Sequence, residues 1–97
     1  MDITKFNVTT TAQAVVSATR RRAIIIQNHS DTDIYIAFDN SGVTGPAGSY
    51  PGIKIPASGG IFAATSVSPW DQTCDRVLHA IHAGSGNKVL VVHEDKS

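Results

Sequence analysis

The chain contains little of the material from which catalytic, metal and disulfide-stabilised sites are built. Its 97 residues include a single cysteine, Cys74. No disulfide can therefore form within the chain, and one thiol cannot make a zinc site by itself. The nucleophile motif G-x-S-x-G and a phosphate-binding loop ending in G-K-S/T are both absent. We therefore expect a protein that is not an enzyme, has no catalytic residues and carries no cofactor.

An excess of charge of one sign is also missing. Eight Lys and Arg residues balance eight Asp and Glu residues, and charged residues make up only 16% of the chain. A neutral chain has no overall field that would attract nucleic acid or an anionic membrane. We therefore expect no nucleic-acid partner and no membrane partner, and we expect recognition to depend on shape and local chemistry.

Long apolar runs are absent too. No stretch of the sequence approaches the roughly 18 apolar residues of a membrane-spanning helix. The first residues, MDITKF, lack the basic start and the apolar run of a signal peptide. These absences lead us to expect a protein that is made in a cytoplasm.

What the sequence does contain is a series of short β-type runs. Runs rich in Val, Ile, Thr and aromatic residues are separated by Gly, Pro, Asn and Asp, without alternating helices. The sequence predicts an all-β fold for residues 1–97, a single antiparallel β-sandwich or jelly-roll-like barrel of about eight short strands. Residues 1–10 can extend from this domain as an arm. The expected strands are residues 2–10, 13–17, 24–27, 34–38, 53–55, 61–64, 76–83 and 88–94.

Two pairs of these strands are predicted to form antiparallel hairpins. The strands at residues 24–27 and 34–38 are joined by the polar turn HSDT, whose short side chains can bond their own backbone. The strands at residues 76–83 and 88–94 are joined by the turn GSGN. Each pair would then lie side by side in one sheet.

Two apolar stretches bear on the position of the core. Ile25 and Ile36, in the first predicted hairpin, are expected to be core residues. The run at residues 89–92 is long enough to be covered on both faces, either centrally in the sandwich or by a neighbouring subunit.

Two loops carry large aromatic side chains. The loop at residues 39–52 is rich in Gly and Pro and holds Tyr50, and residues 66–75, with one helical turn at most, hold Trp70. Aromatic residues in loops often anchor protein interfaces. They can equally fold back to cap the ends of a sandwich, or stack on sugar rings, so a carbohydrate-binding module is an alternative function.

The densest charge in the chain is the triplet Arg20, Arg21 and Arg22. A basic cluster can contact phosphates, pair with carboxylates of a partner protein, or mark a solvated strand entrance. Because successive side chains of a strand point to opposite faces, a strand would divide the triplet. Together with Tyr50 and Trp70, these three arginines are our candidates for a protein interface.

The histidine and aspartate residues do not form a metal-binding pattern. His79 and His82 lie three positions apart on an expected strand, so their side chains point to opposite faces. The acidic residues of the turns fit no calcium-loop consensus, and turn chemistry accounts for them. We therefore expect no metal site.

Four segments of the chain follow a recognisable pattern. After a Thr-rich first strand come RRRAIIIQN at residues 20–28 and DIYIAF at residues 33–38, then PGIKIP at residues 51–56 and AIHAGSGNKVLVVHE at residues 80–94. In these segments the chain resembles small all-β virion structural proteins of tailed bacteriophages. The loops that hold Tyr50 and Trp70 are longer here than in the simplest of those proteins.

The resemblance implies a non-enzymatic virion component. Its first expectation is a capsid decoration or cement protein that binds the outer shell of the major capsid protein. The alternatives are a neck, tail or head-fibre module, or a carbohydrate-binding module at a fibre tip. The resemblance also implies a homo-oligomer, with a trimer matching the local threefold positions of an icosahedral shell, and a location in the virion after synthesis in the host cytoplasm.

Overall fold

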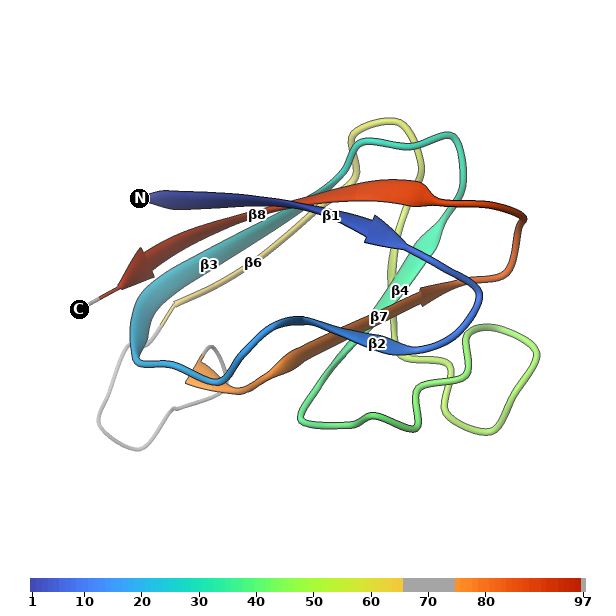
Figure 1. Ribbon diagram of the computed structural model, residues 1–97, viewed down its shortest axis with the longest axis horizontal. Coiled ribbons are helices and arrows are strands. Elements are labelled where there is room, and N and C mark those ends of the chain that lie inside the picture. The colour runs from blue at the N-terminus through green and yellow to red at the C-terminus, as the bar shows by residue number, and fades with distance from the viewer. Residues whose placement is uncertain (66–74, 97) are drawn as a thin grey trace.

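Two four-stranded antiparallel sheets pack against each other in the computed structural model, which describes residues 1–65 and 75–96 (Figure 1). Sheet A has the strand order β1-β8-β3-β6 and sheet B has the order β2-β7-β4-β5. The strands are β1 (Asp2–Val8), β2 (Gln13–Val16), β3 (Arg21–Asn28), β4 (Ile34–Phe38), β5 (Ile53–Ile55), β6 (Ile61–Thr65), β7 (Leu78–His82) and β8 (Lys88–Lys96). The predicted all-β sandwich is confirmed. Among the described residues no helix is long and apolar enough to cross a membrane.

The core lies between the two sheets and is built from alternate residues of each strand. Ile24 and Ile26 face inward from sheet A, and Ile34 and Ile36 from sheet B, all with 0% exposure. Fully burying such a side chain contributes about 1.5–3 kcal/mol. The other buried members of the core cluster are Val8, Val15, Val16, Ile55, Leu78, Ala80, Leu90 and Val92, and Phe6, Phe38, Phe62 and Ala64 pack against them.

The strand order is that of a jelly roll. Consecutive strands lie in different sheets everywhere except β4 and β5, so the chain crosses from one sheet to the other at six of its seven connections. Eight strands arranged as two such interleaved sheets form the double Greek key of jelly-roll domains. Of the two architectures that the sequence left open, the topology therefore fits the jelly roll.

The predicted hairpin at residues 24–38 is wrong, because β3 belongs to sheet A and β4 to sheet B. The connection is a corner held by the buried side chain of Asn28. Its Nδ2 donates to the carbonyl oxygens of Thr32 (2.8 Å) and Ile55 (2.9 Å), and its Oδ1 accepts from the backbone N–H of Ser30 (3.0 Å). The polar turn thus satisfies a buried amide while the chain changes sheets.

The second predicted hairpin is also wrong, since β7 lies in sheet B and β8 in sheet A. The buried imidazole of His82 holds this corner. Its Nδ1 accepts from the Gly84 N–H (3.1 Å), and its Nε2 lies 2.7 Å from the Gly86 carbonyl oxygen. Gly86 has φ +73°, a conformation that favours glycine.

The N-terminal segment is not an extended arm. All seven residues of β1 pair with β8 in continuous antiparallel register, from Asp2 opposite Glu94 to Val8 opposite Lys88. The inward residues of β1 include Phe6 and Val8, which contribute to the core. The strand is therefore the edge of sheet A in its own chain.

The structure also corrects the position of Ile25. The side chains of Ile24 and Ile26 are buried in the core, whereas Ile25 lies on the opposite face of β3 and is half-buried. Ile36, the other expected core residue, is fully buried as predicted. An unbroken apolar run carries no alternation, so it does not reveal which of its residues face inward.

The two faces of β3 predict opposite effects of one substitution. We expect Ile24→Asp to prevent folding, because an unpaired carboxylate in the core costs much of the ~5–15 kcal/mol by which domains are stable. Ile25→Asp should cost only about 1–2 kcal/mol, because its carboxylate can reach water. Thermal unfolding followed by circular dichroism measures both. A cooperatively folded Ile24→Asp protein would contradict the assignment of the two faces.

Candidate docking surface

The outer face of sheet A is an apolar surface that points away from the core. The register places its side chains in rows across the four strands. One row runs Lys5, Val91, Gln27 and Ile61, and the next runs Ile3, His93, Ile25 and Ala63. Ile3 is 66% exposed and Ile61 is 61% exposed. We call this surface the outer face, with the apolar members Ile3, Ala23, Ile25, Ile61, Ala63, Val89 and Val91.

Sheet B differs, because the long loop at residues 39–52 covers part of its outer side. Ile81, on β7, is 8% exposed and Val43, in the loop, is 3% exposed, although neither belongs to the core cluster between the sheets. Gly45 of the loop lies against the side chain of Ile81. The chain therefore covers apolar groups on the outside of sheet B, whereas on sheet A it leaves Ile3 and Ile61 exposed. The outward residues Ile25, Val89 and Val91 between them are half-buried. This contrast marks the outer face of sheet A as the candidate for docking.

The expected two-sided coverage of residues 89–92 is only partly supplied by the chain. β8 is a central strand of sheet A, between β1 and β3. Leu90 and Val92 are fully buried against sheet B. Val89 and Val91 lie on the outer face and are half-buried. Of the two sources of cover that the sequence suggested, the sandwich therefore accounts for one side of this run.

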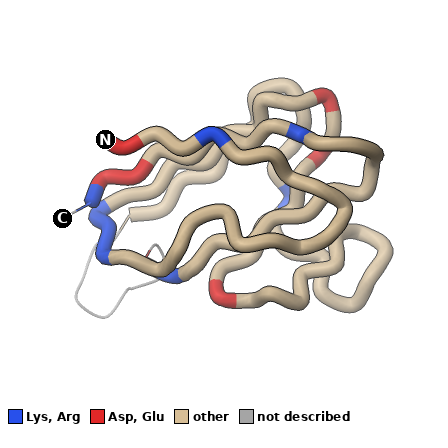
Figure 2. The backbone as a smooth tube through the Cα atoms, viewed as in Figure 1, with Lys and Arg blue, Asp and Glu red and all other residues tan. Residues whose placement is uncertain are grey.

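The arginine triplet is divided between the inner and outer sides of sheet A, and a register shift between Arg21 and Ala23 places Arg21 on the inner side, where regular alternation from Ile24 would have placed Arg22. Arg20 and Arg22 are exposed, and Arg22 pairs with Asp95 at 3.4 Å near one end of the outer face. Arg21 is 1% exposed. For Arg21 the prediction of a surface contact is therefore corrected: the side chain is enclosed within its own chain. Figure 2 shows charged residues of both signs gathered at the end of the molecule that carries the two termini.

Arg21 ties the two sheets together at that end. Its Nε donates to Glu94 Oε2 at 2.5 Å, and Glu94 is 4% exposed. The guanidinium also donates to the carbonyl oxygens of Arg76 (3.1 Å) and Ser17. These acceptors lie on β8 and in the segments that flank β2 and β7, so one buried cation joins elements of both sheets.

The two aromatic candidates are not brought to the outer face. Tyr50 is 62% exposed on the long loop, where its backbone bonds in both directions to Thr44. This loop lies on the sheet B side of the sandwich, through the contact of Gly45 with Ile81. Trp70 lies outside the described residues.

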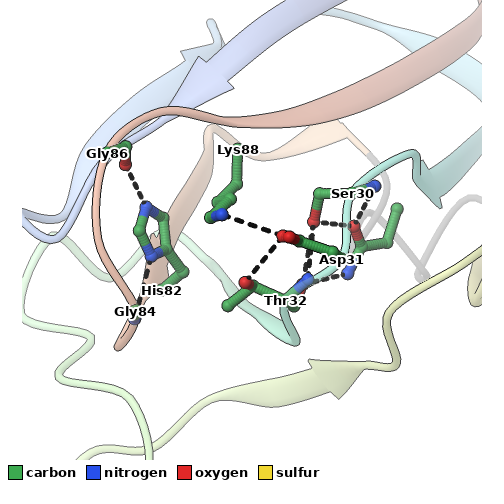
Figure 3. A network of polar contacts seen from close by, with 8 residues as sticks. Ser30, Asp31, Thr32, His82, Gly84, Gly86 and Lys88 are labelled. Carbon is green, nitrogen blue, oxygen red and sulfur yellow. Dashed lines mark hydrogen bonds and ion pairs between the residues drawn. The ribbon is translucent and has the colours of Figure 1, made fainter.

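A polar network joins the corner after β3 to the start of β8 (Figure 3). Lys88 Nζ lies 2.8 Å from Asp31 Oδ1, which also accepts from the hydroxyl of Thr32 at 3.0 Å. The hydrogen bond from Lys88 is the main cause that lowers the pKa of the Asp31 carboxyl below its ordinary value of 3.8, and the bond from Thr32 adds to it. Ser30 bonds within the same corner. The network stabilises the corner between β3 and β4 and joins it to β8, and its two charges, Lys88 and Asp31, pair with each other.

The remaining acidic turn residues are engaged in local contacts. Asp33 accepts from the Ala57 N–H at 2.9 Å, and Asp39 pairs with Arg76 at 2.8 Å. Turn and ion-pair chemistry thus accounts for these carboxylates. Across residues 1–65 and 75–96, no group of three or more His, Cys, Asp and Glu side chains is placed to hold a metal ion. Within the same residues, His79 Nδ1 is a buried side-chain atom without a hydrogen-bond partner.

Sequence reasoning missed the outer face because its members are spread over four strands. Ile3, Ile25 and Ile61 are far apart in the chain and meet only through the register of β1, β8, β3 and β6. A signal was available in the run at residues 89–92, since its length predicts cover on both faces. The strand order was needed to show that β1 and β6 extend the same surface.

Comparison with known proteins gives no family for the chain: no protein-family model matches it, and neither a curated protein nor a solved structure does. The functional inference therefore depends on the geometry of the chain itself.

The buried ion pair gives the first prediction from this region. We expect Glu94→Gln to lower the free energy of unfolding by about 3–5 kcal/mol, because it leaves the buried Arg21 charge without its carboxylate. Asp95→Asn, the matched control at the next position, removes the carboxylate from Arg22, whose side chain is 69% exposed. It should cost less than about 1 kcal/mol. Urea unfolding measures both values, and equal losses would contradict the role assigned to Arg21.

The Asp31 contacts predict a pH-dependent contribution to stability. A pKa below 3.8 in the folded chain means that the ionised carboxyl of Asp31 stabilises the fold. This contribution is complete above pH 3.8, the ordinary value, and is lost as the pH falls through the lower folded pKa. The small stability difference between the native chain and Asp31→Asn should therefore be constant above pH 3.8 and shrink below it. Thermal unfolding across the acid range measures it. A difference that already disappears near neutral pH would contradict the assignment.

Proposed function

We propose that the chain is a non-enzymatic structural protein of a bacteriophage virion, a capsid decoration protein that binds the outer shell of the major capsid protein. The observation that carries this proposal is the outer face of sheet A, where the described part of the chain leaves Ile3 and Ile61 exposed and the apolar residues of the central strands half-buried. Contiguous apolar surface on a small domain commonly marks a protein interaction site. A decoration protein requires one such surface and no catalytic group.

The fold supports the same proposal by analogy. Jelly-roll domains recur in viral coats and also in lectins. Because a fold alone does not define a function, this support is weaker than that of the surface. The resemblance of the sequence to small phage structural proteins favours the virion over the lectin.

The proposal includes an assembly and a location. A homo-oligomer, with a trimer at the local threefold positions, would match the symmetry of an icosahedral shell. Several linked copies would strengthen modest single contacts through avidity. The partner is then the major capsid protein or another virion protein, and the chain is located in the virion after synthesis in the host cytoplasm.

Two alternatives retain a specific basis. A neck, tail or head-fibre module would use the same apolar face against a different virion protein. A carbohydrate-binding module at a fibre tip would draw on the exposed ring of Tyr50, 62% accessible on the long loop, because aromatic rings can stack on sugars.

The copy number in purified particles tests the proposal. We expect mass spectrometry of density-purified particles from the source to find about one copy per capsid subunit, or one per few, because a decoration protein follows the lattice. The major capsid protein serves as the internal standard. A copy number on the order of ten per particle would instead indicate a neck, tail or fibre role. Absence from clean particles would overturn the virion proposal and leave sugar binding as the leading candidate.

A further inference from the structure

We infer that the outer face of sheet A docks on a protein surface that presents a carboxylate to Lys5 within an apolar patch. This inference rests on the proposed function and adds the chemistry of the partner surface. It follows from the place of Lys5 on the face, the pairing of the other charges, and the size of the surface.

Lys5 lies among apolar side chains. It stands opposite Val91 on the neighbouring strand, and Ile3 lies two residues away on the same side of β1. Ile61 lies at the far end of the row that Lys5 begins. A partner that covers Ile3 and Val91 must therefore also cover the region of the Lys5 side chain.

Lys5 differs from most other cations of the described chain because it has no carboxylate partner there. Among residues 1–65 and 75–96, which include all eight Lys and Arg residues, six of these cations form ion pairs with Asp or Glu. The remaining two are Lys5 and Arg20, and only Lys5 lies on the outer face. Withdrawing an ammonium group from water without a carboxylate is costly. The partner that fits this face therefore supplies a carboxylate opposite Lys5.

A second copy of the chain does not fit that requirement. Within residues 1–65 and 75–96, six Asp and Glu side chains already pair with cations, and Asp75 accepts from the Arg21 N–H at 2.9 Å. Among the described residues, two outer faces in contact would bring two Lys5 side chains, and the carboxylate on that face, Asp95, already pairs with Arg22. Copies in the proposed oligomer would thus associate through other surfaces.

The size of the outer face also argues against a second copy of the chain as the partner. Four strands about 4.8 Å apart and about seven residues long, at ~3.3 Å per residue, span roughly 440 Å². A stable interface buries about 800 Å² on each partner. Two flat faces alone would therefore make a weak dimer, whereas a larger partner can continue the contact beyond the rim of the face.

A sugar does not fit the face either. The aromatic residues of sheet A, Phe6 and Phe62, belong to the inward side of their strands and pack against the core. No Phe, Tyr or Trp side chain lies among the described members of the outer face. The surface offers apolar and cationic contacts, which suit a protein, and lacks the flat rings on which sugars stack.

Zero-length carbodiimide coupling on intact particles tests the contact directly, because it joins an amine to a carboxylate only where the two touch. We expect a cross-link between Lys5 and an Asp or Glu of a different polypeptide. A cross-link of Lys5 to another copy of this chain would overturn the inference.

Binding of variants to particles supplies the second readout. Lys5→Glu should weaken binding at least about tenfold, since close interfacial charge pairs couple by ~1.5 kcal/mol or more. Arg20→Glu is the matched control. It makes the same change at the other cation that has no carboxylate partner within the described part of the chain, at a position outside the four strands, and should change binding less than about threefold. Melting temperatures confirm that both variants fold.

The outcomes separate the inference from the proposed function. Absence of the chain from particles, seen in the copy-number measurement, would refute the proposed function. Presence on particles with unchanged binding of Lys5→Glu would overturn only the inference. Loss of binding by Ile25→Asp together with unchanged binding of Lys5→Glu would also overturn it, because the face would then dock without a carboxylate.

Discussion

The fold depends on buried polar groups at three of the six connections where the chain changes sheets, those between β2 and β3, β3 and β4, and β7 and β8. Within the described ranges the buried polar and charged residues are Arg21, Asn28, His82 and Glu94. The first three lie at strand ends next to these connections, and Glu94 pairs with Arg21 from within β8. Asn28 satisfies carbonyl groups after β3, His82 holds the turn after β7, and Arg21 with Glu94 joins both sheets at the end with the termini. A sandwich whose consecutive strands lie mostly in different sheets has many such crossings. Hydrogen-bonded corners therefore complement the apolar core, because an unsatisfied polar group there would cost more than one core contact contributes.

The strands were predictable because each is a short β-branched run between turn residues, but their pairing was not. The turn residues after β3 and before β8 favour a change of direction equally well in a hairpin and in a crossing between sheets. Asn28 decides the first case, since its amide reaches Ile55 in a distant strand, and that contact depends on the assembled fold. The continuous run around Ile25 likewise hid which residues face inward. Arg21 was expected at the surface for a related reason. Only the register of β8 against β3 shows that Glu94 is buried beside Arg21 and pairs with its guanidinium.

The two sheets differ in what their own chain places over them. On sheet B the long loop brings Gly45 against the outward side chain of Ile81, which is only 8% exposed. On sheet A, side chains of comparable character at Ile3 and Ile61 remain exposed. Single exposed apolar residues are normal on protein surfaces, but here register aligns several in adjacent rows. That alignment, more than any single exposure value, makes the face our candidate for a contact surface.

A bare apolar face beside the open edge of β1 exposes the chain to self-association. Lys5 lies on that edge strand and belongs to that face. When two copies approach face to face, the two ammonium groups enter the same apolar contact, and desolvating them without a carboxylate opposes the dimer. Against a partner that carries a carboxylate, the same ammonium adds attraction and fixes orientation. One side chain thus disfavours the wrong partner and favours the right one, which is how specificity arises on a surface whose apolar contacts alone would discriminate little.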